Sequence, residues 1–488
     1  MSESLKQKTI LGIFWSSVER FSVQGTQFVL GIILARLLLP ADFGLIGMLV
    51  VFLAISQSFV DSGFANALIR KQNRTEVDFS TVFYFNIVVG LVFYFVLFFA
   101  SPYIAAFYNA PILESLTKVI ALNVFINSLT IVQRAKFTIN VDFKTQTKAS
   151  LLSVLISGAI GIWLAYQGFG VWALAVQSIV ASFINMIALW IYSRWLPRKV
   201  FSISSFKELF SYGSKLLLAG LIDTVYRNIY LIVIGRKFSQ SDLGYYTRAN
   251  EFTQFPSINV TGVLYRVIFP ILSSIQDDDE KLREIYRKFL RLSAFIIFPL
   301  MMGLFGVGEP LIHLLLTEKW ANAVLLLQIL CLAQMWYPIH AINISLLQVK
   351  GRSDLYLRLE IIKKVIGVVI LCITIPMGLV AMCCGLVVSS LIALLINTYY
   401  TGKLIQVGYL QQMKDLLQIL GISLSMGIIV LGITLLIHIK ILSLLVGIVT
   451  GGIYYFSVAY LIKSKELQEI KSLLNIHKIK NKLWTTQK

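Results

Sequence analysis

Long apolar runs, separated by short polar stretches, recur along the whole of this 488-residue chain. Residues 83–100, 151–165, 171–191 and 419–437 are four examples, and a helix needs roughly 20 such residues to cross a bilayer core of ~30 Å. Only helices and closed barrels satisfy their backbone groups inside lipid, and these runs are continuous rather than alternating. The pattern therefore predicts an all-α polytopic membrane protein with about fourteen transmembrane helices.

The polar stretches set the limits of the expected spans. In residue numbers, the spans are 10–36, 43–69, 79–101, 115–133, 149–166, 169–193, 208–235, 243–272, 292–312, 322–349, 360–376, 379–402, 413–437 and 441–462. A basic tail at 463–488 follows them, and we expect most of it to form an amphipathic cytoplasmic helix.

Composition agrees with this pattern, because 57% of the residues are hydrophobic and only 14% are charged, against about 25% charged in an average globular protein. The formal net charge of +19 does not indicate a nucleic-acid partner, since the basic residues lie in short stretches between apolar runs. Alternate connections, counted with both termini, hold 33 of the 43 lysines and arginines, and the opposite set holds 4. This asymmetry predicts a multi-pass membrane protein with both termini in the cytoplasm.

An ungapped internal match appears when the chain is compared with itself at an offset of 200 residues. Residues 34–44 align with 234–244, and Arg36, Asp42 and Gly44 meet Arg236, Asp242 and Gly244. The offset equals six expected helices, an even number, so the two halves share one orientation, as in parallel transporter repeats. We expect a six-helix lobe at 1–200, a second at 201–405, two further helices at 406–462 and a tail at 463–488.

Charges inside the expected spans are the candidate functional groups, since they are costly in a membrane. The basic ones are Arg20, Arg36, Lys118, Arg227, Arg248 and Arg266, and the acidic ones are Glu19, Asp61, Asp223 and Glu251. Apart from Lys118, all of them fall in spans 1, 2, 7 and 8, the first two helices of each half. Lys118 and Arg36 lie near helix ends and can reach the interface.

Spacing along the helices divides these charges into two groups. Asp223 and Arg227 are four residues apart and Arg248 and Glu251 three, so each pair shares a helix face, as a structural ion pair or as part of a site. Arg20 and Arg266 have no acidic residue at either spacing, which favours a hydrated cationic cavity. Because arginine keeps its charge and binds phosphate in a bidentate manner, such a cavity suits an anionic ligand.

Four segments resemble the polysaccharide transporter branch of the multidrug/oligosaccharidyl-lipid/polysaccharide (MOP) exporter superfamily, the Wzx-type flippases. They are FWSSVER at 14–20, LLPADFG at 38–44, FVDSGF at 59–64 and DLGYYTRA at 242–249. The resemblance covers essentially all of residues 1–460. It implies the MOP flippase fold, which consists of two pseudo-symmetric six-helix bundles plus two C-terminal helices.

The resemblance also implies a function. Such flippases move an undecaprenyl-diphosphate-linked repeat unit from the cytoplasmic to the periplasmic leaflet by alternating access, for O-antigen, capsule or exopolysaccharide synthesis.

Matched by position, the residues expected to bind the diphosphate are Arg20, Arg227, Arg248 and Arg266. Candidates for ion coupling or charge pairing are Asp61, Asp223, Glu251 and Glu19. The second span departs from the family pattern, because its deep charge is Asp61 rather than an arginine. The expected partners are the isoprenoid-linked oligosaccharide, membrane lipid and the polysaccharide polymerase machinery.

Three other functions are weighed against this one. A peptidoglycan-precursor flippase shares the chemistry with another sugar load, and a multidrug/cation antiporter of the same superfamily requires a more acidic cavity. A membrane polysaccharide polymerase or glycosyltransferase requires a sizeable outer loop, whereas most outer connections here are a few residues long. The four cysteines and the histidines show no metal-ligand spacing, so we expect no enzyme activity, no metal and no cofactor.

Overall fold

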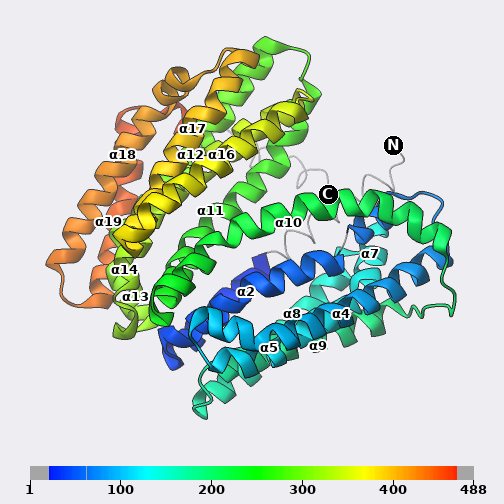
Figure 1. Cartoon of the computed structure of the whole chain (residues 1–488). Coiled ribbons are helices and arrows are strands. Elements are labelled where there is room, and N and C mark those ends of the chain that lie inside the picture. Colours follow the sequence, from blue (N-terminus) through cyan, green and yellow to red (C-terminus); the bar gives the residue numbers. More distant parts are fainter. Residues whose placement is uncertain (1–20, 62, 470–488) are drawn as a thin grey trace, which may run out of the picture. The chain divides into compact units, whose positions relative to one another are not determined.

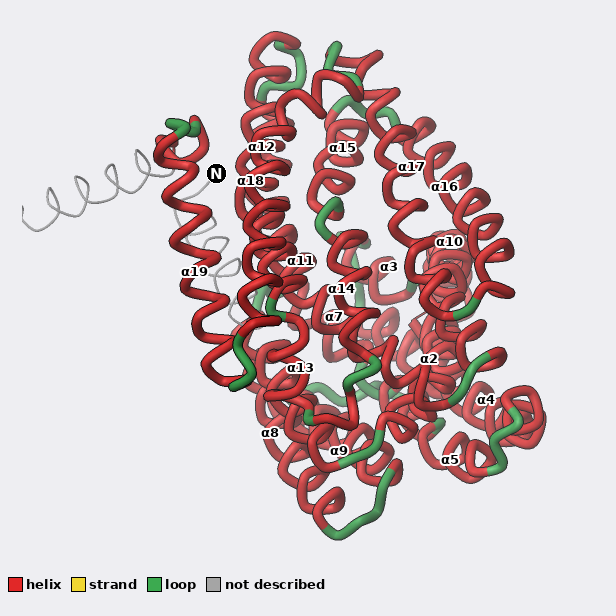
Figure 2. Tube along the Cα trace, turned by 90° about the vertical axis from the view of Figure 1, so that its left-hand side faces the viewer, coloured by secondary structure: helices red, strands yellow, loops and turns green. Residues whose placement is uncertain are grey.

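The computed structural model describes residues 21–61 and 63–469, and along them Figure 2 shows only helices and loops, without a strand. Within these ranges, twelve helices are long and apolar enough to cross a membrane. Two more expected spans are helical but fall outside that count. The first, Phe21–Leu37, starts at the first described residue, and the eleventh, α16 (Ser353–Thr374), carries five charged side chains. The predicted all-α membrane architecture is confirmed, with fourteen as an approximate number.

The chain divides into two compact units, residues 1–247 and 248–488. After Phe21–Leu37, the helices of the first unit are α2 (Pro40–Asp61), α3 (Phe64–Arg70), α4 (Glu76–Tyr108), α5 (Ile112–Ile120), α6 (Leu122–Ser128), α7 (Ile131–Ile139), α8 (Phe143–Tyr166), α9 (Val171–Ser193), α10 (Ile203–Lys237) and the start of α11 (Gln240–Ser274). Within this unit α10 packs along α2, and α8 packs along α9 (Figure 1). The expected lobe boundaries at 200 and 405 stay a prediction.

The second unit contains the rest of α11 and the helices that follow it. These are α12 (Asp279–Gly306), α13 (Gly308–Leu316), η1 (Glu318–Trp320), α14 (Ala323–Gln334), α15 (Tyr337–Val349), α16, η2 (Ile375–Met377), α17 (Leu379–Ile405), α18 (Tyr409–Leu436) and α19 (Lys440–Leu461). In this unit α12 packs along α18, and α16 along α17 (Figure 2).

The internal repeat is confirmed at the turn before α2 and the turn before α11. The carboxylate of Asp42 accepts a hydrogen bond from the Leu39 N–H at 2.9 Å, and Asp242 accepts one from the Ser239 N–H at 3.1 Å. Each of these bonds occupies the same place in its half, 200 residues apart. An aspartate in the first turn of a helix also suits the positive end of the helix dipole. The aligned Asp and Gly therefore mark one turn structure, built twice.

The two turns also pack against each other within the first unit, through their glycines. A Cβ atom placed on Gly44 would lie 1.8 Å from the carbonyl oxygen of Gln240, and one placed on Gly244 would lie 1.9 Å from that of Pro40. The contact is thus reciprocal, with each glycine facing the first residue of the equivalent helix. Only glycine allows two backbones to approach this closely, as in the small-residue contacts of other membrane helices.

Two expected spans of the first unit are broken helices, and this corrects the prediction of continuous ones. The second span, expected at 43–69, divides into α2 and α3 around Gly63, whose φ of 69° is left-handed. A Cβ on Gly63 would lie 2.7 Å from the carbonyl oxygen of Gly213 in α10. Both the left-handed backbone and this close approach therefore require glycine at position 63. The fourth span, expected at 115–133, is built from α5, α6 and α7 and reaches residue 139.

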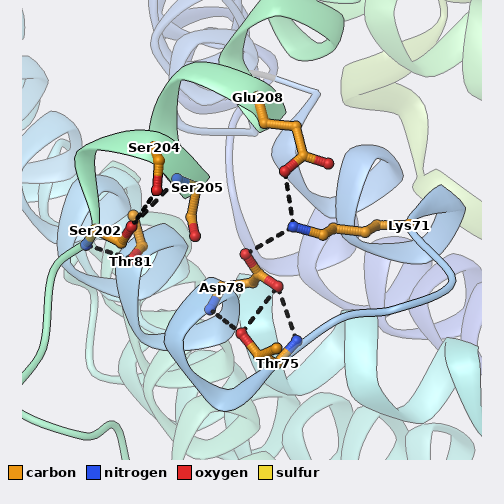
Figure 3. Close-up of polar contacts among 8 residues, drawn as sticks. All are labelled: Lys71, Thr75, Asp78, Thr81, Ser202, Ser204, Ser205 and Glu208. Carbon is orange, nitrogen blue, oxygen red and sulfur yellow. Dashed lines mark hydrogen bonds and ion pairs between the residues drawn. The ribbon is translucent and has the colours of Figure 1, made fainter.

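A cluster of polar contacts fastens the start of α10 to the start of α4 (Figure 3). Lys71 bonds the carboxylates of Asp78 and Glu208 at 3.0 and 2.9 Å, and Asp78 is only 1% exposed. Asp78 also forms a capping box with Thr75 at the N-terminus of α4. Glu208, followed by Asp78, raises the pKa of Lys71 above its usual 10.5. The stabilisation from this shift is therefore complete below pH 10.5 and is lost only as the pH rises through the raised value.

We expect Lys71→Met to destabilise the protein by about 3 kcal/mol, because it leaves the buried Asp78 carboxylate without its cationic partner. Thermal unfolding of the purified protein in detergent measures the effect. The double variant Lys71→Met/Asp78→Asn removes the buried charge as well, and we expect it to recover most of the loss. A single variant as stable as the wild type would contradict this assignment.

The core of the second unit is tied together by the amide of Gln412 in α18. Its nitrogen donates to Asn343 and Thr401, each at 3.0 Å, and to the Tyr286 hydroxyl at 3.3 Å, while its oxygen accepts from Asn343 at 3.1 Å. All four side chains are buried, and they come from α18, α15, α17 and α12. A buried polar network that is satisfied in this way favours one particular packing of the helices.

The basic segment 276–291, expected as a loop, mostly belongs to α12, which begins at residue 279. Arg287 forms a bidentate pair with Asp415 of α18 at 2.6 and 2.7 Å. One turn later Arg291 forms an ion pair of 3.0 Å with Glu466, whose side chain is nearly buried. Residues 465–469 are helical, and the rest of the expected tail helix lies outside the described residues.

Candidate functional site

A pocket of about 360 Å³ lies where the two broken helices of the first unit meet α10. Gly63, at the break in α2–α3, and Thr130, at the break before α7, both line it, as do Leu216 and Gly220 of α10. Irregular backbone at membrane depth is tolerated where it is buried in protein or lines a water-filled cavity. Broken helices also mark the binding sites of many transporters. The further polar lining residues are Gln57, Ser58, Asp61, Asn66, Asn127 and Arg134.

Asp61 and Arg134 are the charged groups of this pocket, and both side chains are exposed. Asp61 accepts a hydrogen bond from the Gln57 amide at 3.0 Å and interacts electrostatically with the guanidinium of Arg134. Sequence reasoning placed Arg134 in a cytoplasmic loop at 134–148, which is wrong, because it lies in α7 (Ile131–Ile139). The acid expected to stand alone in the second span therefore has a basic neighbour from the fourth.

The predicted pair of Asp223 and Arg227 is present on α10, with the Arg227 Nε 2.6 Å from the carboxylate. A hydrogen bond of 3.1 Å between Ser58 and Thr224 links α2 to α10 beside this pair. Thr224 lies one helical turn after Gly220, which lines the pocket. Arg227 lies ten residues, roughly 15 Å, before the end of α10, yet its side chain is 76% exposed. A charge facing lipid at this depth is costly, which favours a hydrated environment for Arg227.

The other described candidates lie on α11 in the second unit. Arg248 pairs with Glu251, as the spacing predicts, and its side chain is nearly buried. Arg266 is half-buried further along the same helix. Arg20 and Glu19 lie outside the described residues, so the expected contribution of the first span stays a prediction. The structure thus brings four of the candidates together, in one local pair on α10 and one on α11.

Sequence reasoning missed a second set of charges in the second unit, because they lie at the start of the eleventh span, expected at 360–376, and were counted with the basic loop before it. Glu360 and Lys363 lie inside α16 and form an ion pair of 2.5 Å near the middle of that helix. His340 of α15 bonds Ser390 at 3.0 Å and Asn397 at 3.2 Å, both from α17, and Lys363 acts on it electrostatically. The expectation that span charges concentrate in spans 1, 2, 7 and 8 is therefore incomplete. The spacing of three residues between Glu360 and Lys363 was the signal for this pair in the sequence.

Broken helices, a polar pocket and an exposed arginine at membrane depth define a multi-pass α-helical membrane protein of the transporter class. The fold is shared with solved transporters. A structure entitled lipid II flippase MurJ, inward closed conformation, superposes with a TM-score of 0.75 and 14% identity, covering 92% of this chain and 99% of that one.

Sequence comparison places the chain more narrowly. The family model described as polysaccharide biosynthesis protein matches residues 33–325, and the chain belongs to this family. The teichuronic acid biosynthesis protein TuaB of Bacillus subtilis is 26% identical, over 72% of this chain and 73% of that protein. The lipopolysaccharide biosynthesis protein WzxC of Escherichia coli is also 26% identical, over 81% of this chain and 80% of its own length. The predicted resemblance to a polysaccharide family is confirmed by this match and these relatives.

Proposed function

We propose that the protein is a flippase for lipid-linked oligosaccharides. It translocates an undecaprenyl-diphosphate-linked repeat unit from the cytoplasmic to the periplasmic leaflet for surface polysaccharide synthesis. Arg227 carries the proposal, since it is an exposed, fixed positive charge inside a membrane helix, where the cost of facing lipid favours a hydrated environment. A polysaccharide biosynthesis family member with such a group is suited to a lipid whose polar head bears a diphosphate.

In this proposal Arg227 and the other arginines, Arg20, Arg248 and Arg266, hold the diphosphate. Asp223 and Glu251 keep Arg227 and Arg248 oriented through their ion pairs. The two repeat halves then alternate between states open to either leaflet, each state favoured by the ligand that binds it better. Asp61, Asp223, Glu251 and Glu19 remain the candidates for coupling transport to an ion.

The proposal includes an orientation and a location. The protein lies in the bacterial plasma membrane with both termini in the cytoplasm, because the lysine- and arginine-rich connections are expected on that side. Polysaccharide polymerase machinery would receive the translocated lipid on the outer face. The chemistry of the relatives' named products, teichuronic acid and lipopolysaccharide, favours surface polymers over the peptidoglycan-precursor alternative.

Complementation of a flippase-deficient bacterial strain tests the function. We expect the wild-type chain to restore surface polysaccharide, measured by polysaccharide electrophoresis, and to leave resistance to cationic drugs unchanged. A chain that raises drug resistance without restoring polysaccharide would instead be an antiporter of the same fold. An empty vector and an unrelated multi-pass protein expressed at the same level are the controls.

A further inference from the structure

The pocket between the broken helices has the chemistry of a site for a neutral, hydroxyl-rich ligand. Its volume of about 360 Å³ falls within the roughly 300–1,000 Å³ of small-ligand sites. The side chains of Gln57, Asn66 and Asn127 bring three amides into its lining, and each amide can both donate and accept hydrogen bonds. Sugar hydroxyls need this dual capacity, because each of them also donates and accepts.

Two of these amides are available for a ligand. Neither the side chain of Asn66, exposed on α3, nor that of Asn127, half-buried on α6, hydrogen-bonds another part of the described chain. Gln57, in contrast, already donates to Asp61. Polar groups that line a pocket inside a membrane protein require water or a ligand as partners.

The charge of the pocket favours a sugar over a diphosphate as its ligand. Its charged groups, Asp61 and Arg134, balance each other, so the pocket carries no formal net charge. A diphosphate would be repelled by the carboxylate there, and it finds better partners among the arginines outside. A neutral sugar is not repelled, and both charged groups can still hydrogen-bond its hydroxyls.

The position of the pocket fits a ligand that has a diphosphate at one end and sugars at the other. Gly220, which lines the pocket, and Arg227 are seven residues apart on α10. Two turns of helix place them on the same face, separated by roughly 10 Å. A lipid whose diphosphate meets Arg227 would therefore bring its first sugars to the level of the pocket.

We propose that this pocket is a sugar-binding subsite that selects the oligosaccharide next to the diphosphate, with Asn66 and Asn127 as specificity-determining residues. The inference rests on the proposed flippase function. It assigns Arg134 to sugar binding, and it gives Asp61 this role in addition to its candidacy for ion coupling. A site built to hydrogen-bond hydroxyls discriminates strongly against ligands that lack them.

The test is lipid binding to the purified full-length protein in nanodiscs. The probes are undecaprenyl diphosphate and its derivatives carrying a single glucose, galactose, N-acetylglucosamine or glucuronate. We expect at least one sugar to strengthen binding over the bare lipid. Asn66→Leu and Asn127→Leu should each reduce that gain about threefold to tenfold, with binding of the bare lipid unchanged.

Asn140→Leu is the matched control, because Asn140 is exposed at the end of α7 and does not line the pocket. We expect it to retain the full gain from the sugar. The inference is overturned if no sugar strengthens binding to the wild type, or if both pocket variants keep the gain. A wild type that binds neither the bare nor the glycosylated lipids would refute the flippase function itself. Elution as a single monodisperse peak confirms that each variant is folded.

Discussion

Substitution of either Gly44 or Gly244 with alanine is expected to destabilise the protein by about 3 kcal/mol or more, with similar effects at the two positions. The added methyl group would lie within 2 Å of a carbonyl oxygen, Gln240 O in the first case and Pro40 O in the second. Both obstacles are backbone atoms at the start of a helix, so no side-chain rotation relieves the clash, and the two helices must move apart.

The double variant distinguishes this contact from two independent defects. Once one alanine has separated the helices, the second costs less. The loss of stability in the double variant should therefore be clearly smaller than the sum of the two single losses. Thermal unfolding in detergent, followed by size-exclusion chromatography, gives the comparison. Gly25→Ala is the control, since a Cβ at that position would meet no atom of another described segment within 4 Å. Additive losses, or variants as stable as this control, would contradict a shared contact.

The second large effect is expected at Arg227, where alanine should lower the transport rate about 10- to 100-fold. Loss of a charge-assisted bond to the diphosphate accounts for this range, at about 1.5–3 kcal/mol. The exposed side chain fills no packed space, so protein yield should stay unchanged. Restoration of surface polysaccharide in the flippase-deficient strain, at matched expression, measures the effect.

Two further variants separate charge from geometry at this position. Arg227→Lys keeps the positive charge but loses bidentate binding, so we expect an intermediate rate. Lys237→Ala removes a basic residue from the exposed end of the same helix and should transport as the wild type does. If Arg227→Ala and Lys237→Ala behave alike, Arg227 does not contact the substrate.

Much of this architecture follows from the sequence because membrane helices obey simple rules of length and charge. The expected spans agree with the helices wherever an apolar run is continuous, as in α8 and α9. The offset of 200 residues locates both outer turns, since an aspartate three residues after the turn residue forms the same hydrogen bond in each. Spacings of three and four residues also identify the pairs at Arg227 and Arg248 correctly.

The candidate site is less predictable, because it depends on where helices break. Short polar stretches precede Gly63 and Thr130, but the apolar pattern resumes directly after them and so predicts single spans. The close approach of the Gly213 backbone, which explains why position 63 requires glycine, is visible only in the structure. Arg134 follows an apolar run, so the sequence favours a loop although the residue reaches the pocket. Likewise, the sequence places the start of the eleventh span at residue 360, whereas α16 begins at residue 353 and holds the ion pair of Glu360 and Lys363 near its middle.

Reconstituted transport tests the central claim, that this chain translocates a lipid-linked oligosaccharide. The purified protein is placed in liposomes containing glycosylated undecaprenyl diphosphate extracted from the flippase-deficient strain. Access of the sugar to an enzyme that cannot cross the membrane reports its leaflet. We predict that the sugar initially inside becomes accessible with the wild type, and much more slowly with Arg227→Ala. If wild-type liposomes protect the inner sugar as fully as protein-free liposomes do, the claim is contradicted.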